Sequence, residues 1–181
     1  MFGTHFYHQK IRKCVAIFGT LFNNLYVVRG GSGQVKVPLS YAPRQKYLER
    51  IRENPDLVND TKVALKLPRM SFEIVSYAYD STRQLVKTTN FNTSGSSRNS
   101  RQKFNTPVPY SINFELNVYA KTQDDALQIV EQILPTFNPQ YSVTINPFGT
   151  EFPTFKEDIP IIMVGLAFAD DFEGPLEARR T

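Results

Sequence analysis

The side chains best suited to binding chemistry gather in one polar stretch of the sequence, residues 81–109. The stretch is rich in Ser, Thr and Asn, lacks acidic residues, and interleaves five basic residues with two phenylalanines: Arg83, Lys87, Phe91, Arg98, Arg101, Lys103 and Phe104. Basic side chains attract phosphates and aromatic rings stack on unpaired bases, so this pattern is typical of single-strand nucleic-acid binders. Two other interpretations stay open: a solvated flexible loop, and an arm that orders against a partner subunit.

Other motifs in the sequence argue against a catalytic or metal site. The run GGSGQVK, residues 30–36, lacks the Gly-Lys-Ser/Thr ending of a phosphate loop and predicts a hairpin turn. His5 and His8 have no Cys, Asp or Glu close by in the sequence, so we expect a surface pair. Adjacent carboxylates point to different faces of an element and form no ready acid–base pair: Asp124-Asp125, Glu157-Asp158 and Asp170-Asp171. We therefore predict no catalytic residue, no metal and no cofactor.

Length and composition predict one domain over residues 1–181, with residues 81–109 as a polar, mobile loop. Hydrophobic residues make up 41% of the sequence, which is enough for a core. No apolar run approaches the roughly 20 residues that cross a bilayer, and the N-terminus lacks the order of charged and apolar residues found in signal peptides. Cys14 is the only cysteine. We therefore expect a soluble, non-secreted protein of a reducing compartment, without a membrane partner.

Charge is divided unevenly along the chain. Residues 1–114 hold 17 basic and 6 acidic side chains, a net charge of +11, whereas residues 115–181 hold 4 and 11, a net charge of −7. This asymmetry is typical of a basic nucleic-acid-binding face, or of two faces with opposite sign that favour head-to-tail contact between copies.

The elements that must position these side chains follow from hydrophobic periodicity. Apolar residues at helical spacing predict three helices, in residues 7–24, 42–54 and 124–134. Alternating or continuous apolar runs predict six strands, in residues 25–29, 34–39, 69–80, 110–121, 141–145 and 159–169. The last strand is apolar enough to predict a central position. This order indicates an α+β fold in which a mixed or antiparallel sheet is flanked by helices.

The third helix has the clearest pattern. Thr122 or Asp124 can cap its start, and Pro135 ends it. Its predicted buried stripe consists of Ala126, Leu127, Val130, Ile133 and Leu134.

This helix also begins a resemblance to a known family. The stretch DDALQIVEQILPTFNPQYSVTINPFGTEFPTFKEDIPI, residues 124–161, strongly resembles the tail sheath stabiliser and completion proteins, which are neck proteins of T4-like contractile-tailed phages. The resemblance extends to MFGTHFYHQKIRKCVAIFGTLFNNLYVVR, VKVPLSYAPRQKYLERI and LPRMSFEIVSYAYD. It covers most of the chain and is weakest in residues 81–109.

The resemblance implies a structural role in a virion. Members of that family form a hexameric ring at the head-proximal end of the tail, on the tail terminator protein and the last layer of tail sheath protein. The ring joins the tail to the head-completion or neck proteins. Their fold is similar to that of tail terminator proteins, and they have no catalytic residues.

Further expectations follow from the same resemblance. It implies assembly in the host cytoplasm, location in the tail neck of the virion, and a ring through which genome DNA can pass without sequence-specific binding. Family members continue past the position of Arg179-Arg180, whereas this sequence ends at Thr181. The alternative is a basic nucleic-acid-binding domain that uses residues 81–109, and the salt dependence of binding distinguishes the two.

Overall fold

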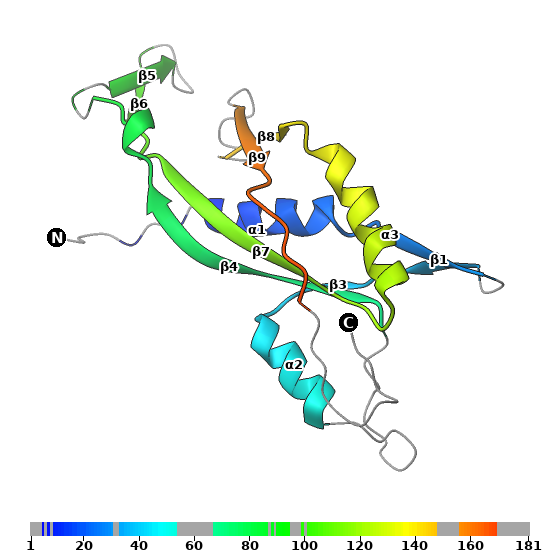
Figure 1. Ribbon diagram of the computed structural model, residues 1–181. Helices are drawn as coiled ribbons and strands as arrows, with labels where there is room; N and C mark the ends of the chain where they lie inside the picture. Colours follow the sequence, from blue (N-terminus) through cyan, green and yellow to red (C-terminus); the bar gives the residue numbers. More distant parts are fainter. Residues whose placement is uncertain are drawn as a thin grey trace. The chain divides into compact units, whose positions relative to one another are not determined.

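The structure is a computed structural model that describes residues 5, 7, 9–30, 33–53, 67–86, 88, 90–94, 99, 101–147 and 156–169 (Figure 1). The chain divides into two compact units. Unit 1 comprises Met1–Phe72 and Leu116–Thr181, and unit 2 comprises Glu73–Glu115. Helices and mixed sheets are combined, so the α+β class predicted from the sequence is confirmed.

Unit 1 begins with a helix and a hairpin. Helix α1 spans Lys10–Leu21, shorter than the helix predicted for residues 7–24. Strand β1 (Tyr26–Arg29) pairs antiparallel with β2 (Gly33–Lys36), as the sequence predicts. Gly33 has a φ of +73°, which glycine adopts without the steric cost that a side chain would add.

The main sheet has three strands in the order β3-β4-β7, formed by Leu39–Tyr41, Arg69–Tyr79 and Tyr110–Tyr119. Strands β3 and β4 run parallel, and the chain between them contains α2, which spans Arg44–Glu53. Strands β4 and β7 both start or end in unit 1 and continue along the chain into unit 2. The sheet is therefore mixed, as predicted.

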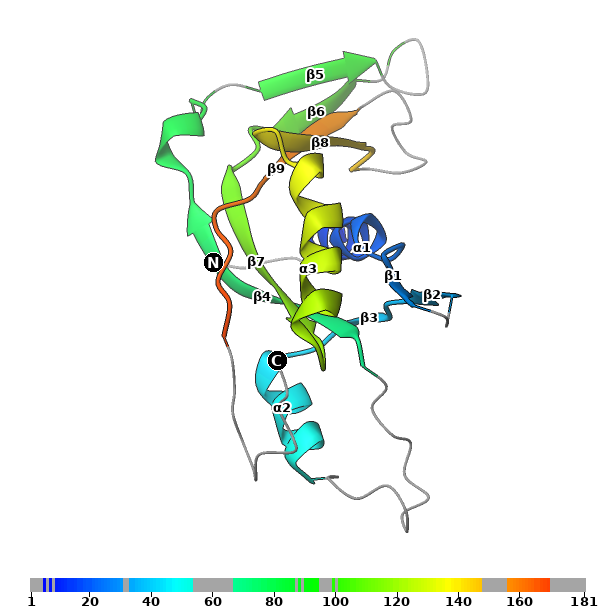
Figure 2. The same ribbon diagram turned by 45° about the vertical axis from the view of Figure 1, so that its right-hand side comes forward.

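The end of unit 1 contains α3 (Gln123–Ile133), a 3-10 turn η2 (Leu134–Thr136), and strands β8 (Gln140–Ile145) and β9 (Glu157–Ile162). Figure 2 shows α3 beside β1, with which it makes contact.

The prediction of a central strand over residues 159–169 was wrong. Within the described residues β9 pairs only with β8, it ends at Ile162, and residues 163–169 belong to no strand. Pro160 lies in the middle of β9 and has no N–H to donate to a second neighbour, so proline favours an edge position here.

The core of unit 1 joins the hairpin, the sheet and α3. Its centre consists of four fully buried side chains: Val27, Val37, Met70 and Ile129. Five partly buried side chains pack around them: Leu25, Leu39, Leu116, Val118 and Ile133. Each buried aliphatic side chain contributes about 1.5–3 kcal/mol, so this cluster is a major source of stability.

Aromatic rings attach α1 to the same sheet. The ring of Phe18 lies 5.2 Å from that of Phe72 in β4, and the ring of Phe22 stacks on Phe137 at 6.2 Å. A Cβ atom on Gly19 would lie 3.2 Å from the Phe72 ring, so glycine permits this close approach. Toward the N-terminus of the helix predicted over residues 7–24, the apolar residues Tyr7 and Ile11 are exposed.

The buried face of α3 differs from the predicted stripe. Val130 is buried and Ala126 and Ile133 are half-buried, as expected, but Leu127 and Leu134 are exposed. The buried face centres on Asp125 and Ile129 instead. A polar residue hidden in a helix interface is not detectable from hydrophobicity, because its partner lies elsewhere in the chain.

Unit 2 contains the far ends of β4 and β7 and the segment between them. The sequence predicts a polar loop over residues 81–109. Inside this range the structure has a 3-10 turn, η1 (Ser81–Arg83), and an antiparallel hairpin of β5 (Asn90–Ser94) and β6 (Arg101–Asn105). Hairpin pairing gives backbone groups partners without a large apolar core, so hydrophobic periodicity does not reveal it.

Candidate interaction surfaces

The hairpin of unit 2 brings several of the predicted contact residues together. In the backbone register Phe91 lies opposite Phe104, Asn92 opposite Lys103 and Ser94 opposite Arg101. Residues two apart in a strand share a face. Arg101 and Lys103 are two residues apart on β6, and Phe91 and Phe104 are paired in the backbone register. Lys87 and Arg98 lie outside the described residues.

Arg83 is held by a neighbouring carboxylate. Its Nε donates a hydrogen bond to Asp80 Oδ2 at 2.6 Å. The hydroxyl of Thr82 also donates to Asp80, at 2.6 Å. The Thr82 hydroxyl and, after it, Arg83 lower the pKa of Asp80 to about 2. Arg83 thus forms an exposed ion pair with Asp80 at the start of the segment that leads to the hairpin.

A row of exposed aromatic and apolar residues runs along one face of the β4–β7 ribbon in unit 2. We call it the aromatic row; it consists of Val75, Tyr77, Tyr79 and Tyr110, all exposed. The rings of Tyr79 and Tyr110 meet edge to face at 5.7 Å. The opposite face is polar: Asn113 Nδ2 donates to Ser76 Oγ at 2.8 Å. This ribbon therefore has one apolar face open to solvent and one polar face.

Sequence reasoning missed the aromatic row although its signal was present. The alternation of Val75, Tyr77 and Tyr79 follows the period of a strand. An exposed aromatic cluster of this kind is typical of a surface that meets another protein.

A second row of exposed apolar residues lies at the end of unit 1. We call it the C-terminal row; it consists of Ile162, Val164, Leu166 and Phe168, all exposed. The residues between them are half-buried or small: Met163, Gly165 and Ala167. Val164 is 97% exposed. Burying such side chains is favourable, and within the described part of the chain no strand pairs with this segment.

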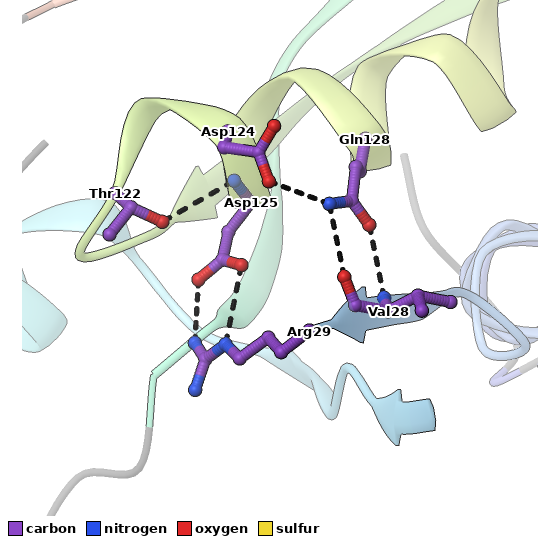
Figure 3. Close-up of polar contacts among 6 residues, drawn as sticks. All are labelled: Val28, Arg29, Thr122, Asp124, Asp125 and Gln128. Atoms are coloured by element: carbon purple, nitrogen blue, oxygen red, sulfur yellow. Dashed lines mark hydrogen bonds and ion pairs between the residues drawn. The ribbon is translucent and has the colours of Figure 1, made fainter. Parts of the chain in front are cut away.

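Helix α3 is fastened to the β1–β2 hairpin by a charged pair (Figure 3). Arg29 donates from Nη2 to Asp125 Oδ2 at 2.5 Å and from Nε to Oδ1 at 3.3 Å. Asp125 is only 2% exposed. The hydrogen bond from Arg29 lowers the pKa of Asp125, while burial opposes the shift. The predicted cap at Thr122 is confirmed, since its hydroxyl accepts a hydrogen bond from the Asp125 N–H.

Two glutamines of α3 continue this attachment along β1. The side-chain amide of Gln128 accepts from the Val28 N–H at 3.0 Å and donates to the Val28 carbonyl at 3.2 Å (Figure 3). Gln132 makes the same pair of bonds with Tyr26, at 3.4 and 2.8 Å. Each side-chain amide thus bonds to β1 as a residue of a neighbouring strand would. It pairs backbone N–H and C=O groups at the outer edge of β1 that would otherwise be unpaired.

Basic residues of α1 hold the β8–β9 hairpin in a similar way. The ammonium of Lys13 donates to the carbonyls of Asn146 and Pro147, at 3.2 and 2.9 Å. Lys10 forms an exposed ion pair with Glu157 at 3.2 Å. Lys10 and Lys13 therefore connect α1 to the β8–β9 region of the chain.

The described residues offer little to catalysis. They contain no cluster of three His, Cys, Asp or Glu side chains suited to a metal ion, and His8 lies outside them. Burial, and then Glu157, raises the pKa of the Cys14 thiol, so this cysteine is not activated as a nucleophile. None of the described helices has the length and apolar character needed to cross a membrane. The open surfaces are suited to protein contact.

Comparison with known proteins identifies the kind of protein that carries these surfaces. Residues 5–181 match the family described as T4-like virus Myoviridae tail sheath stabiliser. The chain belongs to this family. As a tail sheath stabiliser by family, it is similar to the tail completion protein gp15 of Enterobacteria phage T4. The two chains are 30% identical over 194 residues, covering 99% of this chain and 68% of the T4 protein.

Family membership confirms the resemblance found in the sequence and gives the surfaces a context. Tail sheath stabilisers are structural components of the virion tail and associate with other tail proteins.

Proposed function

We propose that the protein forms a hexameric ring at the head-proximal end of a contractile phage tail. There it caps and stabilises the sheath and tube and joins the tail to the neck. Membership of the tail sheath stabiliser family over residues 5–181 is the observation that carries the proposal. The partners are further copies of the chain, the tail terminator protein, the tail sheath protein and the head-completion proteins. Both units act together as one ring subunit, without an enzymatic role.

The distribution of surfaces supports a ring rather than a two-fold dimer. A ring closes through head-to-tail contacts, in which each copy offers two different patches. This chain offers two different exposed apolar rows, one in each unit. Its sequence also divides into a part with a net charge of +11 and a part with −7. Opposite charges on the two patches favour correct register and suppress wrong pairings.

Loss of the protein from the phage tests this function. We expect particles made without it to contain tails that have not joined heads and that lose their sheaths, scored by negative-stain imaging. Addition of the purified wild-type chain to these tails restores joining. Tails that remain sheathed and joined to heads in its absence would contradict the proposal.

The β5–β6 hairpin supports a second candidate, binding of single-stranded nucleic acid, because two basic residues, Arg101 and Lys103, lie on β6 and two phenylalanines, Phe91 and Phe104, are paired in its backbone register. Binding through phosphates weakens with salt at a logarithmic slope of roughly −0.7 per phosphate on single strands. A titration of the protein with oligonucleotide at several salt concentrations separates the two functions. Binding that is tight, steeply salt-dependent and lost in Arg101→Ala/Lys103→Ala favours the second.

A further inference from the structure

We propose that Gln128 and Gln132 guard the outer edge of β1 against pairing with a β-strand of a second copy of this chain. The two glutamines lie four residues apart on α3 and bind this edge with their side-chain amides. In this role they keep separate subunits from joining edge to edge. The inference concerns contacts within one subunit, so it does not depend on the proposed ring.

The outer edge of β1 is a suitable template for another strand. Within the described residues β1 pairs only with β2. Backbone groups of alternate residues point to opposite edges of a strand, and those of Tyr26 and Val28 point away from β2, toward α3. The strand has the sequence Tyr-Val-Val-Arg, whose first three residues favour β-structure, and the side chains of Tyr26 and Val28 are exposed. An open edge of this composition favours pairing between chains.

The two glutamines bind all four of these outward backbone groups. The amide of Gln128 bonds to the N–H and the carbonyl of Val28 (Figure 3), and the amide of Gln132 bonds to both groups of Tyr26. The spacing fits because four residues of a helix advance about 6 Å and two residues of a strand advance about 6.6 Å. A strand of another copy would need the same N–H and C=O groups, so it would compete directly with the glutamines.

Contacts within α3 hold both amides in the guarding orientation. Nε2 of Gln128 also donates to Asp124 Oδ2 at 2.8 Å, and Nε2 of Gln132 also donates to the Gln128 carbonyl at 2.8 Å. At the next position along β1, the buried ion pair of Arg29 with Asp125 attaches the strand to the first turn of the helix. The amides therefore already face β1 in a single subunit, and a competing strand would have to break these contacts.

Removal of both amides tests the inference. Gln128→Ala/Gln132→Ala opens the four outward groups of β1, and we expect self-association to become stronger than that of wild type by about tenfold or more, because backbone hydrogen bonds then form between copies. Sedimentation velocity over a range of protein concentrations measures this change. Val130→Ala is the matched control for lost stability, because it removes buried apolar volume from the same helix and leaves the glutamines in place. It should sediment as wild type does.

Two further measurements locate the new contact at the edge of β1. In the double variant the backbone amides of Tyr26 and Val28 should exchange hydrogen rapidly at low protein concentration and more slowly as the concentration rises. In wild type their exchange should not depend on concentration. Val28→Pro, added to the double variant, should abolish the extra association, because proline removes the outward N–H of this residue and is tolerated at the open edge of a strand.

Each other outcome has a defined meaning. A double variant that associates no more than wild type overturns the inference. Association that Val130→Ala shares, or that Val28→Pro leaves unchanged, also overturns it, because the contact then arises from partial unfolding or from another surface. If the double variant does not fold, Gln132→Ala alone opens the groups of Tyr26, and the same measurements decide the question. Failure of the wild-type chain to form rings would contradict the proposed function and leave this inference standing.

Discussion

At the scale of single residues, Asp125 is a buried carboxylate that joins α3 to β1. Its carboxylate accepts two hydrogen bonds from Arg29, and its backbone N–H donates a hydrogen bond to the Thr122 hydroxyl. A buried carboxylate needs such partners, because an isolated charge away from water is costly. Arg29 lies at the end of β1, so this contact sets the position of the hairpin relative to the start of α3.

The first prediction concerns this pair and its dependence on pH. Asp125→Asn replaces one accepting oxygen by a donor that faces the guanidinium, so we expect a loss of about 2 kcal/mol in the free energy of unfolding near pH 7. The folded-state pKa of Asp125 is depressed. Its stabilisation is therefore complete above the unfolded pKa of about 4 and is lost as pH falls through the folded pKa.

Denaturant unfolding of wild type and Asp125→Asn at several pH values measures this effect. The two stabilities should converge as the medium becomes more acidic than about pH 4. A difference that stays constant to low pH would show that the variant acts through packing and not through the charge.

The sequence could reveal only half of this site. Thr122 and the acidic residues after it are a recognisable start of a helix, and this prediction is confirmed. The partner of Asp125 is 96 residues away. The spacing of residues in one sequence does not indicate which basic residue will pair with a given carboxylate in the folded chain.

At the scale of elements, α3 connects the hairpin and the sheet through one face. Ile129 and Val130 enter the core, and the polar residues beside them bind the edge of β1. Hydrophobic periodicity correctly predicts the helix and its end, but it places the buried face slightly too far toward Leu127 and Leu134. The error arises because Asp125, Gln128 and Gln132 occupy part of the inner face.

The second prediction compares two residues that the sequence pattern treats alike. Val130→Asp should cost roughly 3–5 kcal/mol because it buries a charge without a partner. Leu127→Asp should change stability by about 0.5 kcal/mol or less because its side chain is exposed. Total stability is typically about 5–15 kcal/mol, so thermal unfolding resolves the two easily. Equal melting temperatures would mean that this face of α3 is not buried.

The third prediction concerns the glutamine contacts with β1. Gln128→Ala and Gln132→Ala should each lower stability by about 1 kcal/mol, because each removes two hydrogen bonds to β1, besides one within α3, and leaves backbone groups of β1 to water. Glu131→Ala on the exposed side of α3 is the control. Amide hydrogen exchange at Val28 and Tyr26 should accelerate in the respective variant. Unchanged exchange at both amides would show that the glutamines do not protect this edge.

At the scale of the whole molecule, the most prominent features are the exposed apolar surfaces. The described residues lack a metal-type cluster and an activated thiol, but they present two apolar rows. The fold class and most element positions could be predicted from the sequence, because they follow from local periodicity. The alternation of the aromatic row is visible in the sequence, but its exposure could not be predicted, because exposure depends on which strands find partners. The end of β9 at Ile162 is the clearest example.

The fourth prediction is that residues 81–109 exchange amide hydrogens rapidly in the free subunit and slowly in the assembled tail. This stretch lacks acidic residues and has few apolar anchors, so a neighbouring acidic surface is needed to offset the cost of ordering, about 1–2 kcal/mol per residue. Hydrogen exchange followed by mass spectrometry compares the two states. Fast exchange in both would make the stretch a linker, and strong protection in the free subunit would make it an independently folded element.

The most direct test of the central claim is a cryo-electron microscopy map of the head-proximal end of a tail that contains this protein. We expect a sixfold ring of this chain between the last sheath layer and the neck, with each copy contacting the next through two different surfaces. A map with a single copy on the tail axis, or with no density for the chain at this end of the tail, would contradict it.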